Sequence, residues 1–236
     1  MTPALQLTDI TAGYGETTVL RNVTLSVQPG ELVALLGPNG AGKTTALRTA
    51  SGILKPKKGE VEINGVRVTR EHTFNRVSRG LCLIPEGRGI FRSLSVRENL
   101  RLHTQPGKAS GSGIIERAIE VFPDLRDRLN EQAGRLSGGQ QQMLSLARAY
   151  IADPSVVLLD EVSMGLAPRV VDAVFEALHK LASTGIAMLL VEQYVTRAME
   201  MADRVVLLNK GEIVHDGPSS GLDEDAVFRD YMGLTS

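Results

Sequence analysis

The chain has 236 residues, 42% of them hydrophobic, so it can bury a sizeable core and is not a disordered polymer. Its 26 basic and 27 acidic residues nearly cancel, which argues against a uniformly basic protein that binds nucleic acid. A single cysteine excludes an internal disulfide, and the sequence predicts neither a signal peptide nor a membrane span.

Short apolar runs bounded by turns predict strands in the first third of the chain. They are LQLTDI (5–10), VTLSVQ (23–28), ELVALL (31–36), VEINGV (61–66) and LCLI (81–84). Helices are predicted next: Ser95-x-x-Glu98 is a capping box before VRENLRLH (96–103), and GIIERAIEVF (113–122) has helical spacing. We expect TQPGKASGSG (104–113), which joins them, to be a surface loop.

From Val156 onward, predicted strands and helices alternate. The strands are VVLLD (156–160), IAMLLVE (186–192) and RVVLLN (204–209), and the helices are PRVVDAVFEALHKLAS (168–183) and YVTRAMEMA (194–202). This alternation predicts an α/β layered fold. We expect a single domain over 1–236, in which 1–89 and 153–236 form the core and 90–152 form an inserted helical subdomain.

GPNGAGKT (37–44) fits every fixed position of the phosphate-binding pattern G-x-x-x-x-G-K-[ST], between a predicted strand and a predicted helix. Backbone N–H groups of such a loop turn inward around an anion, and the helix start adds a positive dipole end. Lys43 can reach the β- and γ-phosphates, and the Thr44 hydroxyl is placed for Mg²⁺. The predicted nucleotide-binding residues here are Gly37, Pro38, Asn39, Gly40, Ala41, Gly42, Lys43, Thr44 and Thr45.

VVLLDE (156–161) is a buried strand pattern that ends in two carboxylates. In a protein with a phosphate loop, this arrangement presents Asp160 to Mg²⁺ at the carboxyl edge of the sheet. Glu161 would then stand beside the γ-phosphate and polarise the attacking water.

LSGGQ (136–140) precedes the predicted helix QQQMLSLARAYIA, and Ser137-x-x-Gln140 fits a second capping box. Gly138 and Gly139 permit close backbone approach to an anion, which the dipole of the helix also favours. The chain therefore has two helix starts that could face phosphate.

GPNGAGKT, LSGGQ and VVLLDE occur in this order, and together they resemble the nucleotide-binding subunits of ABC transporters over essentially the whole chain. The resemblance implies a P-loop NTPase (RecA-like) core with an antiparallel β subdomain and an inserted helical subdomain. It also implies ATP and Mg²⁺ as ligands, and a head-to-tail dimer. In that dimer, each ATP lies between the phosphate loop of one subunit and the residues Ser137, Gly138, Gly139 and Gln140 of the other.

Further positions follow from the same resemblance. Tyr14 in AGYGETTVL matches the aromatic residue that stacks on adenine, and the loop 163–167 matches the segment that contacts the partner subunit. Glu86 stands where the family usually has a Gln that senses the γ-phosphate and Mg²⁺. Gln193 replaces the usual His, and it can donate a hydrogen bond to a γ-phosphate but cannot become a cation.

PEGR (85–88) and VEQ (191–193) resemble one of the two ATPases of branched-chain amino-acid importers, whose relatives also serve urea and short amides. The implied partners are transmembrane permease subunits, a second identical or homologous ATPase and, indirectly, an extracytoplasmic solute-binding protein, with no nucleic acid. The implied location is the cytoplasmic face of the cell membrane. Ile90, Phe91 and Leu94 fall where the family docks a permease helix, or they pack within the helical insertion.

Three other functions are weighed against this one. A soluble ABC-type ATPase acting on nucleic acid or ribosomes would usually have tandem cassettes, coiled coils or zinc inserts. A GTPase or small-molecule kinase has no role for LSGGQ, and Asn209-Lys210-Gly211-Glu212 is better explained as a turn between strands than as a guanine-specificity motif. An exporter subunit is opposed only by PEGR and VEQ.

Overall fold

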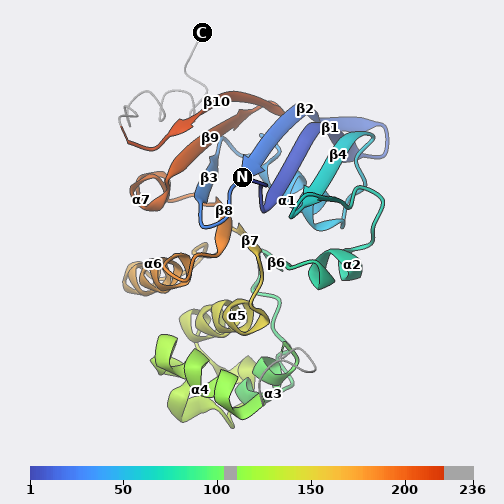
Figure 1. Ribbon diagram of the computed structural model, residues 1–236. Coiled ribbons are helices and arrows are strands. Elements are labelled where there is room, and N and C mark those ends of the chain that lie inside the picture. The colour runs from blue at the N-terminus through green and yellow to red at the C-terminus, as the bar shows by residue number, and fades with distance from the viewer. Residues whose placement is uncertain (104–110, 221–236) are drawn as a thin grey trace.

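The computed structural model describes residues 1–103 and 111–220, which form two β-sheets and a group of helices (Figure 1). The larger sheet has the order β10-β9-β3-β8-β7-β6, and the smaller, antiparallel sheet has the order β2-β1-β4-β5. In the larger sheet only the edge strand β10 is antiparallel to its neighbour. The strands are β1 (Leu5–Tyr14), β2 (Thr17–Val27), β3 (Leu32–Leu36), β4 (Lys58–Ile63), β5 (Val66–Arg67), β6 (Leu81–Ile84), β7 (Val156–Asp160), β8 (Ala187–Val191), β9 (Arg204–Asn209) and β10 (Glu212–Pro218).

The helices lie on both sides of the larger sheet, and those between residues 96 and 182 form the lower part of the molecule in Figure 1. They are α1 (Lys43–Ser51), α2 (Thr73–Ser78), α3 (Val96–Arg101), α4 (Gly111–Val121), α5 (Gly138–Ala152), α6 (Pro168–Ala182) and α7 (Val195–Met201), with 3₁₀ turns at Pro123–Arg128 and Ala133–Arg135. Both predicted capping boxes are present, at Ser95 and at Ser137. Within the described residues, no helix is both long and apolar enough to cross a membrane.

The central strands are buried on both faces, which explains their uninterrupted apolar runs. In β3, Leu32, Ala34 and Leu36 face one core, which continues into the helices α3 to α7. Val33 and Leu35 face the other core, which lies between the two sheets and includes α1. The larger sheet therefore stands between the antiparallel sheet and the helical part. The division at residues 89/90 and 152/153 stays a prediction.

Four predicted elements differ from those observed. The strand predicted at 23–28 begins already at Thr17, in the hairpin with β1. The strand predicted at 61–66 ends at Ile63, because Asn64 and Gly65 have positive φ and form a turn before β5. The first strand continues beyond Ile10 to Tyr14, because it pairs with β2 in a long hairpin. The predicted loop 104–113 is wrong for residues 111–113, which belong to α4, while 104–110 lie outside the described residues. Glycine and serine are weak helix formers, but extending an existing helix costs far less than starting one. The apolar face of α4, with Ile115 and Ile119 buried, packs on α5 and stabilises that helix.

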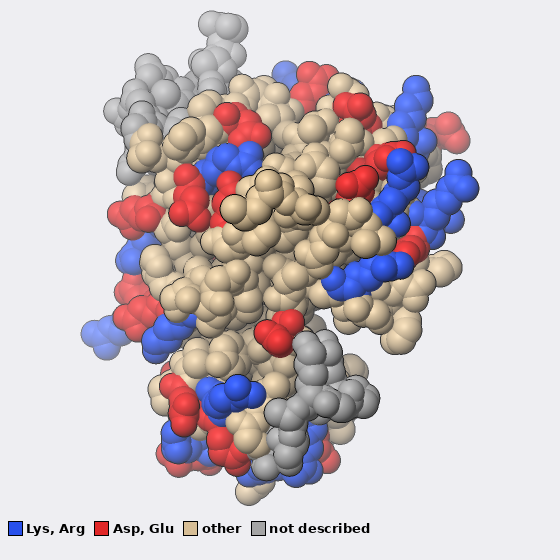
Figure 2. All heavy atoms as spheres, in the orientation of Figure 1, with Lys and Arg blue, Asp and Glu red and all other residues tan. Residues whose placement is uncertain are grey.

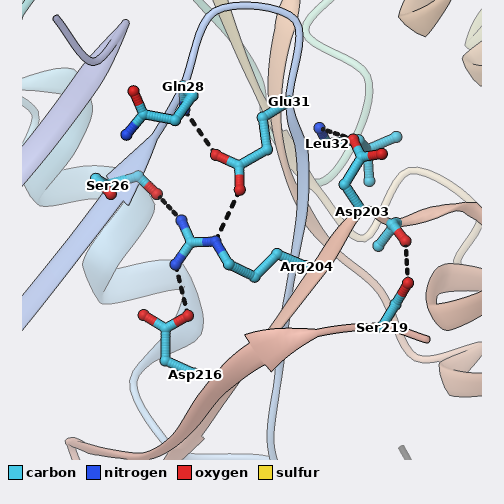
Figure 3. A network of polar contacts seen from close by, with 9 residues as sticks. Ser26, Gln28, Glu31, Leu32, Asp203, Arg204, Asp216 and Ser219 are labelled. Atoms are coloured by element: carbon cyan, nitrogen blue, oxygen red, sulfur yellow. Dashed lines mark hydrogen bonds and ion pairs between the residues drawn. The ribbon is translucent and has the colours of Figure 1, made fainter. Parts of the chain in front are cut away.

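Arg204, at the start of β9, joins four strands near one end of the sheets (Figure 3). Its guanidinium donates to Glu31 Oε1 at 2.7 Å, to Asp216 Oδ1 at 2.5 Å and to the carbonyl of Ser26. These partners lie just before β3, in β10 and in β2. The side chains of Arg204 and Glu31 are only 19% and 16% exposed, so water weakens this ion pair little. The cluster fixes the antiparallel sheet against the larger one.

Candidate functional site

Four segments that carry predicted site residues meet at one edge of the larger sheet. Strand β3 leads into the phosphate loop, and β8 leads into Gln193. Strand β7 ends at Asp160, which Glu161 follows, and β6 leads into Glu86. These four strands are consecutive neighbours and run parallel, so their carboxyl ends meet at the same edge. Ligands of open α/β sheets bind at this kind of edge.

The phosphate loop adopts a conformation that requires glycine at two positions. Gly42 has φ +113° and caps the start of α1, and a Cβ atom there would lie 2.7 Å from Leu20 Cδ2. At Gly37, with φ +153°, a Cβ would lie 2.0 Å from the carbonyl oxygen of Leu208. The loop borders a cavity of about 340 Å³. The cavity is lined by Val19, Asn39, Gly40, Gly42, Lys43, Thr44, Thr45 and Glu161.

The loop thus offers an anion a cradle of backbone groups at a helix start, which fits a triphosphate. Lys43 is buried inside it, where its ammonium donates to the carbonyls of Gly37 at 2.6 Å and Pro38 at 3.2 Å. Burial lowers the pKa of Lys43, while the carboxylates of Glu161 and Asp160 oppose that shift. The cation therefore lies within the electrostatic reach of both acids.

Helix α1 is also anchored at its other end. Arg76 of α2 is fully buried and donates to the carbonyls of Thr49 and Ala50, each at 2.8 Å. A cation at the carboxyl end of a helix complements its dipole. The helix that presents Lys43 and Thr44 is thereby fixed at both ends.

The Thr44 hydroxyl donates to Asp160 Oδ1 at 3.1 Å, so two predicted metal ligands from distant parts of the chain lie in contact. Burial raises the pKa of Asp160, as do the nearby charges of Glu161 and Glu86, and only the Thr44 hydrogen bond and Arg48 act in the opposite sense. A hydroxyl and a carboxylate are hard oxygen donors that suit Mg²⁺. In the part of the chain that the structure describes, no group of three or more His, Cys, Asp or Glu could hold a metal ion. Such a cation would therefore depend on phosphate oxygens and water for its remaining ligands, as Mg²⁺ usually does.

Glu161 adopts the left-handed region, with φ +48°, directly after β7. A non-glycine residue there is strained by about 1 kcal/mol or more, and such strain is common at functional sites. Its amide donates to the carbonyl of Val191 at 2.9 Å, and its carboxylate accepts from Gln193 Nε2 at 3.1 Å. The structure thus places the predicted base beside the residue that replaces the family histidine, at the wall of the phosphate-loop cavity.

Tyr14, at the end of β1, is 45% exposed, and its hydroxyl accepts from Arg48 Nη1 of α1 at 3.2 Å. This contact holds the ring on the same side of the molecule as the phosphate-loop helix. Tyr14 is not among the residues that line the phosphate-loop cavity, and its stacking on adenine stays a prediction.

The segment Ser137–Gln140 does not line the phosphate-loop cavity in the described part of the chain. Ser137 is exposed at the start of α5, and its side chain accepts from the amide of Gln140. Gly139 has a packing role that the sequence did not suggest, because a Cβ there would lie 2.3 Å from Val170 Cγ1 of α6. The second predicted phosphate-facing helix start therefore lies apart from this cavity, and its role in binding phosphate stays a prediction.

Glu192 was missed by the sequence reasoning. It is fully buried at the end of β8, and its carboxylate accepts hydrogen bonds from the amide and hydroxyl of Ser163 and from the amide of Gln193. The available signal was a lone acid within the apolar run IAMLLVE. Val162, in place of the family's usual Pro, is buried in the larger core.

Comparison with known proteins gives consistent matches over nearly the whole chain. The family described as "ABC transporter" matches residues 20–164. The high-affinity branched-chain amino acid transport ATP-binding protein BraG of Pseudomonas aeruginosa is 35% identical, over 97% of this chain and 99% of that protein. The probable branched-chain amino acid transport ATP-binding protein LivF of Archaeoglobus fulgidus is 33% identical, over 98% and 99% respectively. Other relatives are named as phosphonates, ribose and Fe(3+) import proteins and as Nod factor export proteins.

Solved structures give the same result. The ATP binding subunit of an ABC transporter has a TM-score of 0.84 at 27% identity, covering 99% of this chain and 100% of that one. A dimeric ATP-binding cassette in a post-hydrolysis state, bound to ADP and Pi, has a TM-score of 0.79 at 26% identity, covering 92% and 100%. The fold class predicted from the sequence is therefore confirmed. From its motifs, its fold and these matches, the chain belongs to the ABC transporter family, as an ATP-binding subunit that hydrolyses ATP.

Proposed function

We propose that the chain is the motor subunit of an importer for branched-chain amino acids. The supporting observation is the match of nearly the entire chain to two relatives named for branched-chain amino acid transport. Relatives named for other solutes share the same cassette, so solute selection lies in the partner subunits. The partners proposed are permease subunits that hold the chain at the cytoplasmic face of the membrane, and indirectly a solute-binding protein.

ATP binds with its triphosphate in the phosphate-loop cavity. The loop amides and Lys43 neutralise the β- and γ-phosphates, and Tyr14 stacks on the adenine. Thr44 and Asp160 would hold Mg²⁺, with Glu86 close to it. The cation supplies charge neutralisation across the phosphate oxygens.

Hydrolysis follows from the position of Glu161 at the cavity wall. The Glu161 carboxylate accepts a proton from water as the water oxygen forms a bond to the γ-phosphorus. The bond between that phosphorus and the leaving oxygen of ADP breaks, and phosphate departs. Gln193, which donates to Glu161 at 3.1 Å, orients the carboxylate and the γ-phosphate but transfers no proton. Catalysis is thus mainly positioning and charge stabilisation.

The second helix start, Ser137–Gln140, completes the site of a partner subunit. It lies outside the phosphate-loop cavity of its own chain, and a solved relative of the same fold is dimeric. A second copy of this chain can supply this segment, and in the working transporter the partner is that copy or a homologous ATPase. Loss of the γ-phosphate would remove the bridge between subunits and let the dimer open.

The permease docks at the segment around Phe91. This side chain is 51% exposed, while Ile90 packs partly buried against the larger core. Arg148 of α5 lies over the Phe91 ring, 5.6 Å from its centre, and also donates to the carbonyl of Gly89 at 2.5 Å. Asn99 of α3 bonds both the amide and the carbonyl of Phe91, at 2.9 Å each. The segment that follows Glu86 is therefore a fixed platform that presents an apolar ring to a partner.

The test is uptake of labelled leucine, isoleucine and valine by cells that make the wild-type chain or one of two variants. Lys43→Ala should abolish both ATP binding and uptake. Phe91→Ser should retain ATP binding and hydrolysis while uptake falls. Unchanged branched-chain uptake with Lys43→Ala would refute this solute, and loss of urea or acetamide uptake instead would identify the other solute class. Loss of ATP binding by Phe91→Ser would place that residue in the core rather than in an interface.

A further inference from the structure

Glu192 is a buried carboxylate with no positive partner. It has 0% exposure, and it makes no salt bridge among the residues that the structure describes. Burial raises the pKa of Glu192, and the neighbouring Glu161 acts in the same direction, whereas hydrogen bonds from Ser163 and Gln193 oppose the shift. Burying such a group is costly, and an apolar residue would continue the pattern of Leu190 and Val191 at lower cost.

The three hydrogen bonds to Glu192 come from two different loops. Oε1 accepts from the amide of Ser163 at 3.0 Å, and Oε2 accepts from the hydroxyl of Ser163 and, at 3.2 Å, from the amide of Gln193. Ser163 belongs to the loop after β7 that also contains Glu161. Gln193 belongs to the loop after β8. A single carboxylate therefore joins the loops of two adjacent parallel strands.

These contacts close a ring around the hydrolytic residues. Gln193 Nε2 donates to Glu161 Oε2 at 3.1 Å and contacts Met164 Sδ at 3.5 Å, while the amide of Glu161 donates to the carbonyl of Val191. The ring thus passes from Glu161 to Gln193, to Glu192 and through Ser163 back to Glu161. The Glu161 carboxylate is thus linked to Glu192 through Gln193, and the Glu161 backbone is linked to Glu192 through the loop of Ser163.

We propose that Glu192 is a positioning residue for ATP hydrolysis: it sets the Glu161–Gln193 contact and fixes Ser163 without touching the nucleotide. This rests on the roles proposed above for Glu161 and Gln193. Each carboxylate oxygen accepts from a backbone N–H, of Ser163 or of Gln193, and a backbone N–H can only donate, so both positions need an acceptor. Ser163 begins the loop that corresponds to the partner contact in the family, so the same carboxylate also holds that loop in place.

Glu192→Gln is the sharpest substitution, because it keeps the size of the side chain and removes one acceptor oxygen. With the amide NH₂ in either orientation, one backbone N–H, of Ser163 or of Gln193, faces another donor. We expect kcat for ATP to fall about 10- to 100-fold, the size of effect that a small misplacement of catalytic groups produces. The KM and the Kd for ATP should stay within about twofold, because the phosphate loop is not altered.

The assay measures ATP hydrolysis by the full-length chain over a range of protein concentrations, with the active fraction counted by stoichiometric ATP binding. Glu200→Gln, the same change at an exposed position of α7, is the matched control and should hydrolyse ATP as the wild type does. A Glu192→Gln rate per ATP-binding site within twofold of wild type would overturn the proposal. So would a decrease in rate that is fully explained by fewer folded molecules.

Ser163→Ala decides the question if Glu192→Gln fails to fold. It removes one donor and leaves the carboxylate, so kcat should fall by less, about 3- to 10-fold, with the Kd for ATP unchanged. In the double variant Glu192→Gln/Ser163→Ala, the decrease in kcat should be smaller than the product of the two single decreases, because both changes act through one contact. An unchanged kcat for Ser163→Ala, or full multiplicativity, would count against the proposal. Glu161→Gln distinguishes failure of the proposed hydrolytic site from failure of the role proposed for Glu192. Normal ATP turnover by Glu161→Gln would refute the hydrolytic site itself. An inactive Glu161→Gln together with normal turnover by Glu192→Gln would refute only the role of Glu192.

Discussion

Replacing Arg204 with methionine tests the view that a few polar contacts, and not apolar burial alone, hold the two sheets together. Methionine keeps most of the length and apolar contact of the side chain but removes its charge and donors. Among the described residues, the change leaves the Glu31 carboxylate, which is 16% exposed, with the backbone amide of Gln28 at 2.7 Å as its one remaining donor (Figure 3). A partly buried carboxylate would then be left without its cation.

The expected cost can be worked out contact by contact. The Arg204–Glu31 bond joins two charged and mostly buried groups, and its loss costs about 1.5–3 kcal/mol. The carbonyl of Ser26 adds about 1 kcal/mol. Asp216 is 36% exposed, so its bond adds less than about 1 kcal/mol. The free energy of unfolding should therefore fall by roughly 2.5–5 kcal/mol in total.

Urea denaturation followed by circular dichroism measures this loss, and the chain contains its own control. Arg197 of α7 also pairs with an aspartate, Asp172, at 2.5 Å, but those side chains are 49% and 53% exposed. The same change there, Arg197→Met, should cost at most about 1 kcal/mol, because water screens the pair. Equal losses in the two variants would refute the argument from burial.

Three further predictions concern the site and its surroundings. Gly37→Ala should prevent ATP binding and destabilise the fold by more than about 3 kcal/mol, because its Cβ would overlap the carbonyl of Leu208. Gly40→Ala, where a Cβ would have no atom within 4 Å, should still fold, and equal thermal stability of the two variants would contradict this prediction. Asp160→Asn should raise the melting temperature at neutral pH, by the equivalent of about 1 kcal/mol, because the raised pKa of Asp160 means that the fold disfavours the charged carboxylate. The same change should abolish hydrolysis, and a lower melting temperature would refute the predicted direction of the stability change. Burial and Arg148 lower the pKa of His103 from 6.5 to about 4. The neutral ring therefore stabilises the fold above pH 6.5, and this contribution, at most about 3 kcal/mol, is lost as the pH falls to 4. A His103→Gln chain should lose less stability over that range, and identical profiles of stability against pH would contradict this assignment.

Figure 2 shows how the nearly balanced charge is distributed over one face of the molecule. Acidic and basic side chains lie beside one another near the edges and in the lower part of that face, around a mostly uncharged centre, and they do not separate into a basic half and an acidic half. The composition predicted a balanced total, but the mixing depends on the fold. Pairs such as Arg79–Glu71, at 2.6 Å, join residues close in the chain, whereas Arg197–Asp172 joins two helices.

The phosphate loop and both capping boxes were predictable because each depends on a short run of residues. Gly42, Lys43 and Thr44 act through local backbone geometry, and Ser137 needs only Gln140 three residues later. The parallel strands of the larger sheet were equally predictable, because burial on both faces leaves a continuous apolar run. The edge strand β10, which is exposed at alternate residues, was not among the strands predicted.

The contacts across the sheet edge could not be predicted in the same way. Thr44 meets Asp160 at 3.1 Å although 116 residues separate them, and Glu192 meets Ser163 across 29 residues. Their proximity depends on the strand order β3-β8-β7-β6, which no local pattern specifies. The start of α4 at Gly111 was missed for a related reason, since tertiary packing overrode the weak propensities of glycine and serine.

We propose that the two phosphate-facing helix starts of one chain serve ATP sites shared between two subunits. Size-exclusion chromatography of Glu161→Gln, with and without Mg-ATP, tests this arrangement. We expect a monomer without nucleotide and, with Mg-ATP, a dimer that retains unhydrolysed ATP. Adding Ser137→Arg should abolish the dimer while each chain still binds ATP. A Glu161→Gln chain that binds ATP and stays monomeric, or one that converts the ATP to ADP, would refute this proposal.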